Sequence, residues 1–282
     1  MQIMQMLKKH GFYFKKKWGQ NFLLNQNLLS RIAAAAALKP GDSVVEIGAG
    51  AGTLTKILAQ SGAKVLAIEI DPSLLPVLNE NLDGYDVTII RGDVLKLDLD
   101  KLTAENGLQW PYKIVANLPY YITTPIIMNI LENEYHVDLM VMLLQWEVAI
   151  RLTAQAGNKE YGASTLTVQY YTEPKILFKV PRQFFKPVPE VDSAVLLLER
   201  LVQPRVKVKN EKLMFKIIKA AFGQRRKMLL NALTAVNPKL KKEQLPEVLE
   251  KAGIEGQRRG ETLSLEEFAR LADVWQDSFG AS

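Results

Sequence analysis

The sequence predicts an α/β fold, in which a mostly parallel sheet carries antiparallel strands at one edge and is followed by a small all-α C-terminal domain. Between residues 43 and 154, short apolar runs alternate with helical patterns, which is typical of parallel sheets covered on both faces. After Gly162 come β-rich stretches without long helical spacers, which we expect at an edge of the sheet. From residue 211 onward the patterns are helical.

The elements of the sheet are expected in the following order. A helix over residues 26–38 comes first, because Asn25 can cap it and Pro40 and Gly41 end it. The parallel strands are then expected at residues 43–47, 64–69, 87–91, 113–116 and 137–144. Helices between and after them are expected at residues 53–60, 72–81, 124–131 and 147–154. The antiparallel strands are expected at residues 165–171, 175–180 and 193–200.

A Pro-containing connector at residues 202–208 divides the chain. Beyond it, helices are expected at residues 211–236, 242–252 and 265–275. Ser264 and Glu267, at the start of the last helix, have the spacing of a capping box. With 282 residues available, we therefore expect two domains, residues 1–203 and 204–282.

Composition excludes several classes of chemistry. The chain has no cysteine, and His10 and His136 are its two histidines, so thiolate zinc sites and Cys–His or Ser–His nucleophiles are absent or poorly supplied. We expect both histidines to be exposed or hydrogen-bonded, and no metal site. No run of about 18 apolar residues occurs, and the N-terminus lacks the order of a signal peptide. A soluble cytoplasmic protein without a membrane partner is expected.

The net charge of +6 is unevenly distributed along the chain. Residues 1–200 hold 20 basic and 20 acidic side chains, whereas residues 201–282 hold 16 and 10. A basic segment beside a neutral one is what a phosphate-binding domain attached to a catalytic domain would show. An ordinary solvated surface explains the same distribution equally well.

A glycine-rich turn follows the first expected strand. Glu46 is followed by Gly48, Gly50 and Gly52, and the third glycine of a dinucleotide fingerprint would instead fall at Thr53. Glycine at every second position is similar to the first motif of S-adenosylmethionine-dependent methyltransferases, whose sheet is Rossmann-like. A glycine-rich turn without a ligand is the alternative.

Two acidic residues end the next two strands. Glu69 is placed to accept hydrogen bonds from ribose hydroxyls, and Asp93 could accept one from an adenine amino group. Each acid alone is more often a helix cap or a solvated turn residue. Together with the glycine turn they mark three successive strand ends, where open parallel sheets bind ligands.

A tetrapeptide at the end of the fourth strand indicates chemistry on an amino nitrogen. The Asn117 side-chain carbonyl and the Leu118 main-chain carbonyl could both accept hydrogen bonds from an NH₂ group and so orient its lone pair. Pro119 makes the turn rigid, and Tyr120 offers a face on which an extruded base can stack. The alternative is a polar turn followed by a core aromatic residue.

From Lys16 to its end, the chain resembles the small-subunit (16S) ribosomal RNA adenine dimethyltransferase family. The matching motifs lie at residues 19–23, 46–55, 68–71, 92–94, 117–121, 185–193, 222–227 and 263–271. The resemblance implies a class I methyltransferase that uses S-adenosylmethionine to dimethylate N6 of two adjacent adenosines in a hairpin near the 3′ end of 16S rRNA. The implied partner is the immature small ribosomal subunit, and the enzyme is expected to be a monomer.

The resemblance also implies roles for individual residues. The cofactor would be bound by Asn21, Leu23, Gly48, Gly50, Glu69, Asp93 and Asn117. Phe185 would stack on the target adenine opposite Tyr120, although without the resemblance we would place this aromatic residue in the core. The N-terminal segment, residues 1–24, would contact RNA and cofactor.

Two basic stretches are expected to contact RNA phosphates, namely Lys16 and Lys17 at the N-terminus and Arg225, Arg226 and Lys227 in the C-terminal domain. Solvated surface charge is the alternative for both. The chain departs from the family pattern at Trp146 and Ile150, where a charge pair is replaced by apolar groups. This departure puts RNA contacts near Trp146 in doubt, or marks an unusual apolar surface.

Three other functions remain compatible with the motifs. A methyltransferase acting on adenine of 23S rRNA shares the glycine turn and the Asn-x-Pro-Tyr tetrapeptide, but typically lacks so long a helical tail. A DNA adenine methylase is disfavoured by the tail and by residues 20–23. The third is a ribosome-assembly binding factor whose methylation activity is secondary.

Overall fold

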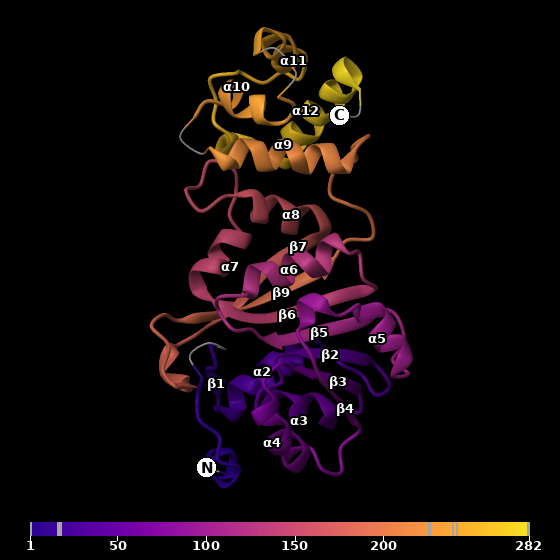
Figure 1. Ribbon diagram of the computed structural model, residues 1–282, viewed down its shortest axis with the longest axis vertical. Helices are drawn as coiled ribbons and strands as arrows, with labels where there is room; N and C mark the ends of the chain where they lie inside the picture. The colour runs from indigo at the N-terminus through magenta and orange to yellow at the C-terminus, as the bar shows by residue number, and fades with distance from the viewer. Residues whose placement is uncertain (1, 16–18, 225–226, 239, 241, 281–282) are drawn as a thin grey trace. The chain divides into compact units, whose positions relative to one another are not determined.

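The computed structural model describes residues 2–15, 19–224, 227–238, 240 and 242–280 (Figure 1). The chain forms two compact units, one comprising Met1–Ala149 and Glu173–Arg200, the other Ile150–Thr172 and Leu201–Ser282. The second unit thus takes in residues 150–172, which precede the expected boundary after residue 203. Tyr170 and Tyr171 donate their hydroxyl protons to Glu211, and Arg205 donates to the Thr172 carbonyl, so these residues are tied to the later helices.

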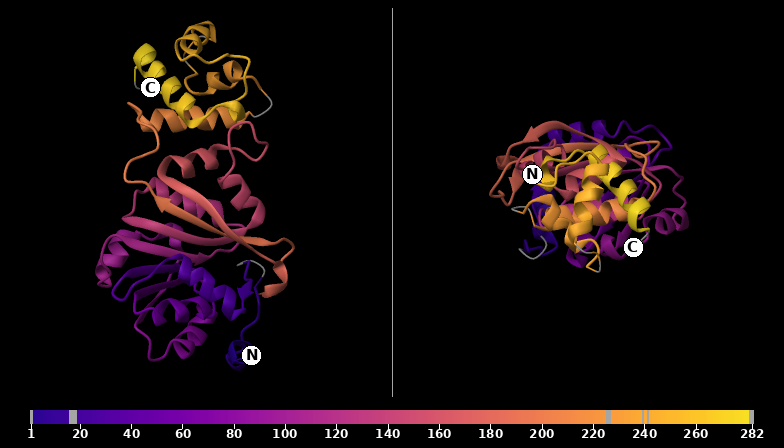
Figure 2. Two further views of the ribbon diagram at one scale, coloured as in Figure 1. Left: turned by 180° about the vertical axis from the view of Figure 1, so that it is seen from behind. Right: turned by 90° about the horizontal axis from the view of Figure 1, so that it is seen from above.

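The first unit is built on a seven-stranded sheet with the order β4-β3-β2-β5-β6-β9-β7, seen from both sides in Figure 1 and Figure 2. Its strands are β2 (Ser43–Ile47), β3 (Lys64–Glu69), β4 (Val87–Arg91), β5 (Tyr112–Asn117), β6 (Val137–Gln145), β7 (Thr172–Val180) and β9 (Ser193–Arg200). Strands β2 to β6 pair in parallel, and β9 pairs with β6 in the antiparallel direction. The expected parallel sheet with an antiparallel addition at β6 is therefore confirmed.

Helices of the first unit connect these strands. They are α2 (Gln26–Ala35), α3 (Thr53–Gln60), α4 (Leu75–Asn81), α5 (Leu99–Glu105) and α6 (Thr123–Glu132). Helix α7 (Trp146–Leu152) begins in the first unit and ends in the second. Asn25 caps α2 as expected, accepting a hydrogen bond from the Leu28 N–H at 3.0 Å. Helix α5 was not expected from the sequence, although Asp98 caps it by accepting from the Lys101 N–H.

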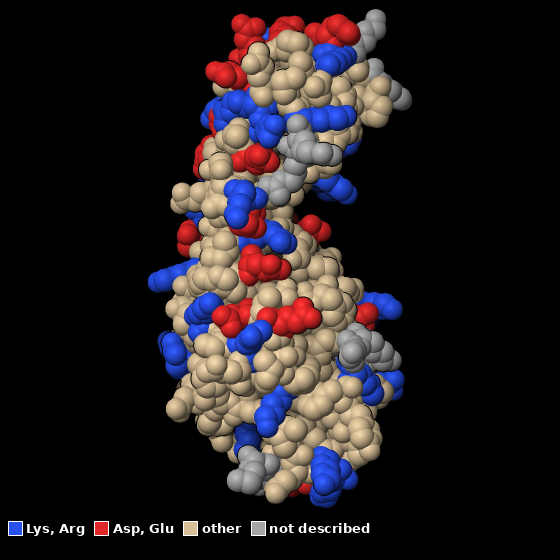
Figure 3. All heavy atoms as spheres, turned by 90° about the vertical axis from the view of Figure 1, so that its left-hand side faces the viewer, with Lys and Arg blue, Asp and Glu red and all other residues tan. Residues whose placement is uncertain are grey.

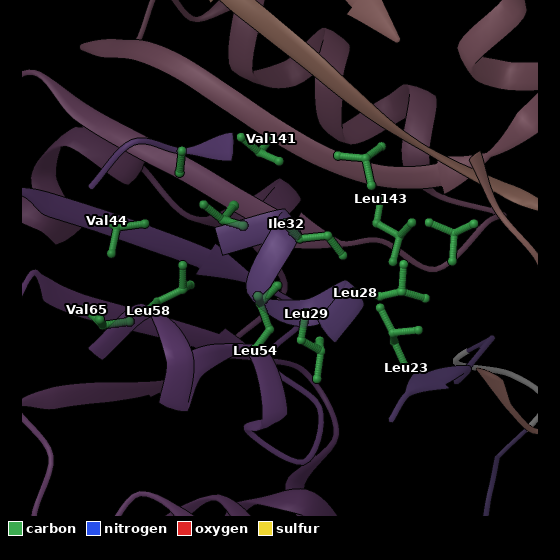
Figure 4. Packing of buried hydrophobic residues seen from close by; sticks show 14 of the residues in the cluster. Leu23, Leu28, Leu29, Ile32, Val44, Leu54, Leu58, Val65, Val141 and Leu143 are labelled. Atoms are coloured by element: carbon green, nitrogen blue, oxygen red, sulfur yellow. The ribbon is translucent and has the colours of Figure 1, made fainter. Parts of the chain in front are cut away.

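The main hydrophobic core lies between helices α2 and α3 and one face of the sheet (Figure 4). Val44 on β2 and Val65 on β3 pack there against Leu54 and Leu58 of α3 and Ile32 of α2. Side chains two positions apart on a strand share a face, so the face that carries Val44 carries Glu46 as well. The core thus continues directly into the glycine-rich turn that follows β2.

The N-terminal segment is tied to the first unit at two places. Strand β1 (Phe22–Leu23) pairs with β8 (Phe185–Lys186) in a short antiparallel sheet, with Leu23 opposite Phe185. Helix α1 (Gln2–Lys9) contributes Leu7 to a second cluster, which also holds Phe22, Leu74 and Val77. The pairing of β1 with β8 was not expected, because a two-residue strand has no recognisable alternation of polar and apolar residues. Helix α1 was not expected either.

One expected strand of the second unit is wrong. Residues 165–171 form most of helix α8 (Ala163–Tyr171), although Thr and Val in this stretch favour strands. Thr165 instead accepts a hydrogen bond from the Gly162 N–H at 3.0 Å and donates to the Arg151 carbonyl at 2.7 Å, which fixes the start of a helix. Tertiary hydrogen bonds override the local preference here.

The remaining helices of the second unit are α9 (Glu211–Gly223), α10 (Leu229–Ala232), α11 (Leu245–Lys251) and α12 (Leu265–Phe279). The expected helix over residues 211–236 is therefore interrupted after Gly223. The capping box before α12 is confirmed, because the Glu267 N–H donates to Ser264 Oγ and the Ser264 N–H donates to Glu267 Oε2. None of the helices in the described ranges is long and apolar enough to cross a membrane.

Candidate functional site

A cavity in the first unit opens beyond the carboxyl ends of β2, β3 and β5. The space between its lining residues is about 770 Å³, its open mouth included. Most of the residues that the sequence predicted for the site line it, namely Asn21, Leu23, Gly48, Gly50, Glu69, Asn117, Leu118, Pro119 and Tyr120. A second, adjoining cavity shares Gly48 and Pro119 with the first and is lined by Asp93 and Tyr121.

The glycine-rich turn after β2 requires its glycines. Gly48 and Gly50 have φ values of 76° and 60°, which other residues rarely adopt. A Cβ atom on Gly50 would stand 3.0 Å from Phe22 Cε1, and one on Gly48 would stand 3.6 Å from the Asn117 carbonyl oxygen. The turn is therefore held close to the N-terminal segment on one side and to the end of β5 on the other.

Glu69 at the end of β3 holds this turn in place. Its Oε2 accepts a hydrogen bond from the Gly50 N–H at 2.8 Å, and its Oε1 accepts one from the Asp71 N–H at 2.7 Å. Burial raises the pKa of the Glu69 carboxyl, although both hydrogen bonds favour the ionised form. A carboxylate oxygen can accept two hydrogen bonds, so Glu69 can still accept from a ligand's hydroxyl groups.

Asp93 lies at the adjoining cavity and caps a 3₁₀ turn. Its Oδ1 accepts a hydrogen bond from the Leu95 N–H at 3.2 Å, and its Oδ2 lies 3.9 Å from Lys96 Nζ. Asp93 therefore acts as a cap in the protein, which was the alternative interpretation of this acid from the sequence. The side chain is 29% exposed, so a ligand in the adjoining cavity can still reach it.

Two carbonyl oxygens at the end of β5 are left to accept hydrogen bonds. The Asn117 side chain donates from Nδ2 to the Asn21 carbonyl at 3.2 Å, which leaves its Oδ1 as an acceptor. The Leu118 N–H donates to the Leu143 carbonyl at 3.1 Å, but nothing in the described part of the chain donates to the Leu118 carbonyl oxygen. The arrangement offers two adjacent acceptors and no competing donor from Pro119.

Tyr120 is fixed by its hydroxyl group while its ring lines the cavity. The hydroxyl lies 2.8 Å from Ser193 Oγ at the start of β9, and burial raises its pKa. The Pro119 carbonyl accepts from the Ile122 N–H at 3.2 Å and from the Thr123 hydroxyl at 3.2 Å, which stabilises the turn between them. Ser193 lies in a matched motif, but its contact with Tyr120, 73 residues away, could not be predicted from local pattern.

The N-terminal segment is fastened beside the cavity by the buried side chain of Asp71. Lys15 Nζ donates to Asp71 Oδ1 at 2.8 Å, and Gln20 Nε2 donates to Asp71 Oδ2 at 2.8 Å. Burial opposes ionisation of Asp71, but hydrogen bonds from Lys15, Ser73 and Gln20 outweigh it and hold the pKa of the carboxyl below its usual range. This network positions Asn21 and Leu23. It was not expected from the sequence, because Lys15 and Gln20 lie 56 and 51 residues before Asp71.

Phe185 is buried in the first unit. Its side chain is 1% exposed and belongs to the main core with Leu23 and Leu143, and it does not line the cavity. This burial agrees with the core position expected from the residue type alone, and the stacking on a target adenine that the resemblance implies stays a prediction. The pairing of β8 with β1 places Phe185 opposite Leu23, and both side chains belong to the main core.

Of the expected RNA-contacting residues, the structure describes Lys227. Lys16, Lys17, Arg225 and Arg226 lie outside the described residues. Lys227 is exposed, and its N–H donates to the Gln224 carbonyl at 2.8 Å. On the face shown in Figure 3, basic side chains are interspersed with acidic ones.

The two histidines make local contacts, as expected. His10 Nε2 lies 2.6 Å from Glu80, and His136 Nδ1 lies 2.7 Å from Asp100 while its ring stacks on Trp110. No group of three or more His, Asp or Glu side chains in the described ranges is arranged to hold a metal ion.

Trp146, where the chain departs from the family pattern, borders a shallow surface hollow of the first unit. Lys179 Nζ lies 5.2 Å from the centre of its ring and 2.8 Å from Asp192. The apolar replacement is therefore covered in part by a neighbouring cation.

Comparison with known proteins agrees with this geometry. The family model described as "Ribosomal RNA adenine dimethylase" matches residues 11–271. "Ribosomal RNA small subunit methyltransferase A" of Alkaliphilus metalliredigens is 49% identical over 94% of this chain and 93% of its own. A dimethyladenosine transferase from Plasmodium falciparum has a TM-score of 0.71 at 25% identity, covering 89% of this chain and 95% of its own. The 23S rRNA methyltransferase ErmE has a TM-score of 0.67 at 27% identity, covering 90% and 98%.

Replacing Lys15 with Met should loosen the N-terminal segment, because buried Asp71 loses its charged donor. We expect the free energy of unfolding to fall by about 1–3 kcal/mol, and amide hydrogen exchange over residues 19–23 to become faster. Chemical denaturation and hydrogen exchange with mass spectrometry measure the two effects. Lys9→Met is the matched control, since its ion pair with Glu80 is exposed and should matter little. Equal effects of the two substitutions would show that the Asp71 network does not fasten the segment.

Proposed function

The chain belongs to the ribosomal RNA adenine dimethylase family, and we propose that its cavity binds the methyl donor. We propose further that the enzyme dimethylates N6 of two adjacent adenosines in a hairpin near the 3′ end of 16S rRNA. Its activity is that of an S-adenosylmethionine-dependent rRNA adenine dimethyltransferase. The observation that carries the proposed site is the pair of acceptor oxygens of Asn117 and Leu118 beside the glycine-rich turn.

The cavity has the groups that the cofactor requires. Gly48 and Gly50 leave room for the methionyl part, because side chains there would fill the space beside Phe22 and the end of β5. We assign the ribose hydroxyls to Glu69 and the adenine amino group to Asp93 in the adjoining cavity. Asn21 and Leu23 cover the cofactor from the N-terminal segment. S-adenosylmethionine, when bound, supplies a methyl group on a positively charged sulfur.

The target amine is oriented by the tetrapeptide at residues 117–120. Asn117 Oδ1 and the Leu118 carbonyl oxygen each accept a hydrogen bond from the amino group, so its lone pair leaves conjugation with the ring and becomes directed. The ring of Tyr120, held through Ser193, supports the base by stacking. No general base is required, since the alkylated nitrogen is acidic enough to release a proton to water or to the Asn117 oxygen.

The RNA partner is recognised through phosphates as well as through the flipped base. We assign phosphate contacts to Lys16, Lys17, Arg225, Arg226 and Lys227, because such contacts position RNA without reading its sequence. The substrate is proposed to be 16S rRNA within the immature small subunit, and the enzyme is proposed to act as a monomer in the cytoplasm.

Replacing Asn117 with Ala should abolish useful turnover, because the amine then loses one of two orienting acceptors. We expect at least a hundredfold loss in methyl transfer, with cofactor binding weakened but measurable, since Nδ2 no longer holds the Asn21 carbonyl. Transfer of radiolabelled methyl groups to immature small subunits measures the rate. The same assay on large-subunit RNA and on duplex DNA separates the rival methyltransferase activities.

Asn133→Ala is the matched control for that substitution, because Asn133 ends α6 and its side chain makes a local contact with the Asn129 carbonyl. It should leave the rate unchanged. Normal turnover by Asn117→Ala would refute the orientation argument. If the inactive variant still rescues subunit assembly in cells, the binding-factor function is favoured instead.

Replacing Arg225, Arg226 and Lys227 together with Ala should flatten the salt dependence of RNA binding. Each lost phosphate contact lowers the slope of log K against log salt by about 0.7–0.9, so a total change of about 2–3 is expected. Filter binding at several salt concentrations measures it. Lys251→Ala is the control, since Lys251 pairs with Glu247 one turn away. An unchanged slope in the triple variant would contradict the assignment.

A further inference from the structure

Trp146 lies next to the cavity, directly after β6. Gln145, the last residue of β6, stands opposite Ser193 on β9, and Ser193 Oγ lies 2.8 Å from the Tyr120 hydroxyl. The Trp146 N–H donates to the Asp192 carbonyl at 3.0 Å. Tyr120 and Trp146 are therefore held by two consecutive residues, whose Cα atoms are about 3.8 Å apart. Both lie where the parallel strands β5 and β6 end, which is the edge of the sheet that binds ligands.

The side chain of Trp146 lines the surface hollow of the first unit and is only half-buried. Val191, which is 37% exposed, lines the same hollow. Lys179 Nζ lies 5.2 Å from the centre of the indole ring. Val148 and Ala149 of the same helix are buried in the protein, so they supply its core contacts. Packing therefore does not account for a large aromatic side chain that stays partly open to solvent beside the cavity.

The charges around this hollow favour a base over a phosphate group. The described residues that line it include two basic ones, Lys179 and Arg182, and three acidic ones, Glu147, Glu190 and Asp192. Both basic side chains have partners, because Lys179 Nζ lies 2.8 Å from Asp192 and Arg182 Nη1 donates to the Glu190 carbonyl at 2.9 Å. A lining without excess positive charge attracts the RNA backbone weakly. Its carboxylates can instead accept hydrogen bonds from the amino group of a base.

We propose that Trp146 stacks on an unpaired RNA base, namely a base next to the adenosine that is held at Tyr120. The inference rests on the proposed function, which places the target adenosine in the cavity. The neighbouring base enters the hollow beside Val191 and lies against the indole ring. Aromatic side chains bind unpaired bases in this way because every base has a flat face. Trp146 is thus a substrate-binding residue at a position where the chain departs from the family pattern.

This contact replaces stacking that the RNA loses when its target base is extruded. A base that leaves the loop no longer stacks on its neighbour, and this loss opposes binding. The ring of Trp146 provides a new stacking partner for the neighbouring base and so offsets part of the cost. Since the contact does not involve the amino group that Asn117 orients, it should strengthen binding of the RNA and leave the methyl transfer step unchanged.

Methyl transfer to immature small subunits that carry a synthetic 3′ hairpin tests the proposal, because single bases of the loop can then be removed. With the intact loop, Trp146→Ala should raise the KM for the subunit about tenfold with little change in kcat. Trp146→Phe keeps an aromatic face and should restore most of the loss. A second set of substrates is abasic at one nucleotide next to a target adenosine. When the missing base is the one that stacks on Trp146, the KM of the parent protein should rise and Trp146→Ala should add no further increase.

Trp110→Ala is the matched control, because Trp110 is 46% exposed but precedes β5 and so lies at the opposite edge of the sheet. It should leave the KM unchanged. Thermal unfolding of each variant identifies any loss of folding, and Trp146→Gln removes the ring in a second way if the Ala variant does not fold. An unchanged KM in a folded variant without the ring, or an increase that persists in full on every abasic substrate, would overturn the inference. Failure of the parent protein to methylate subunits with the intact loop would instead refute the proposed function.

Discussion

The hydrogen bonds from Gly50 and Asp71 to the Glu69 carboxylate are the interaction on which the rest of the site depends. One buried side chain at the end of β3 holds the glycine-rich turn after β2 and fixes the backbone that presents Asp71. Asp71 in turn binds Lys15 and Gln20, so the position of the N-terminal segment follows from the same strand end. A parallel sheet provides this because its neighbouring strands end at one edge.

The N-terminal segment completes a cavity that the sheet alone would leave open. Phe22 packs against the glycine turn, and the Asn21 carbonyl accepts from Asn117 Nδ2 and thereby decides which atom of that amide is left as an acceptor. The orientation of the Asn117 amide consequently depends on a contact with a residue 96 positions earlier in the chain. Phe185 contributes indirectly, through the pairing of β8 with β1, which supports Leu23.

The sequence was sufficient for features that depend on local pattern. Apolar runs located the parallel strands. Glycines at every second position, together with acids at successive strand ends, predicted the edge of the sheet at which the cavity lies. Features that depend on distant partners were missed or wrong: the bridge from Lys15 to Asp71, the anchor of Tyr120 on Ser193, and the helix at 163–171 that its β-branched residues argued against. The buried position of Phe185 agrees with its residue type alone, but its pairing partner Leu23 could not be predicted from a two-residue strand.

Glu46 and Glu69 are both buried near the same turn, but they differ in their hydrogen-bond partners. Backbone N–H groups donate to both oxygens of Glu69 in the folded protein, so these hydrogen bonds offset the cost of burying the carboxylate without any ligand. Glu46 Oε2 has no hydrogen-bond partner among the described residues, and burial raises the pKa of this carboxyl to about 8, which favours its neutral form. The geometry of the turn therefore rests on Glu69 and not on Glu46.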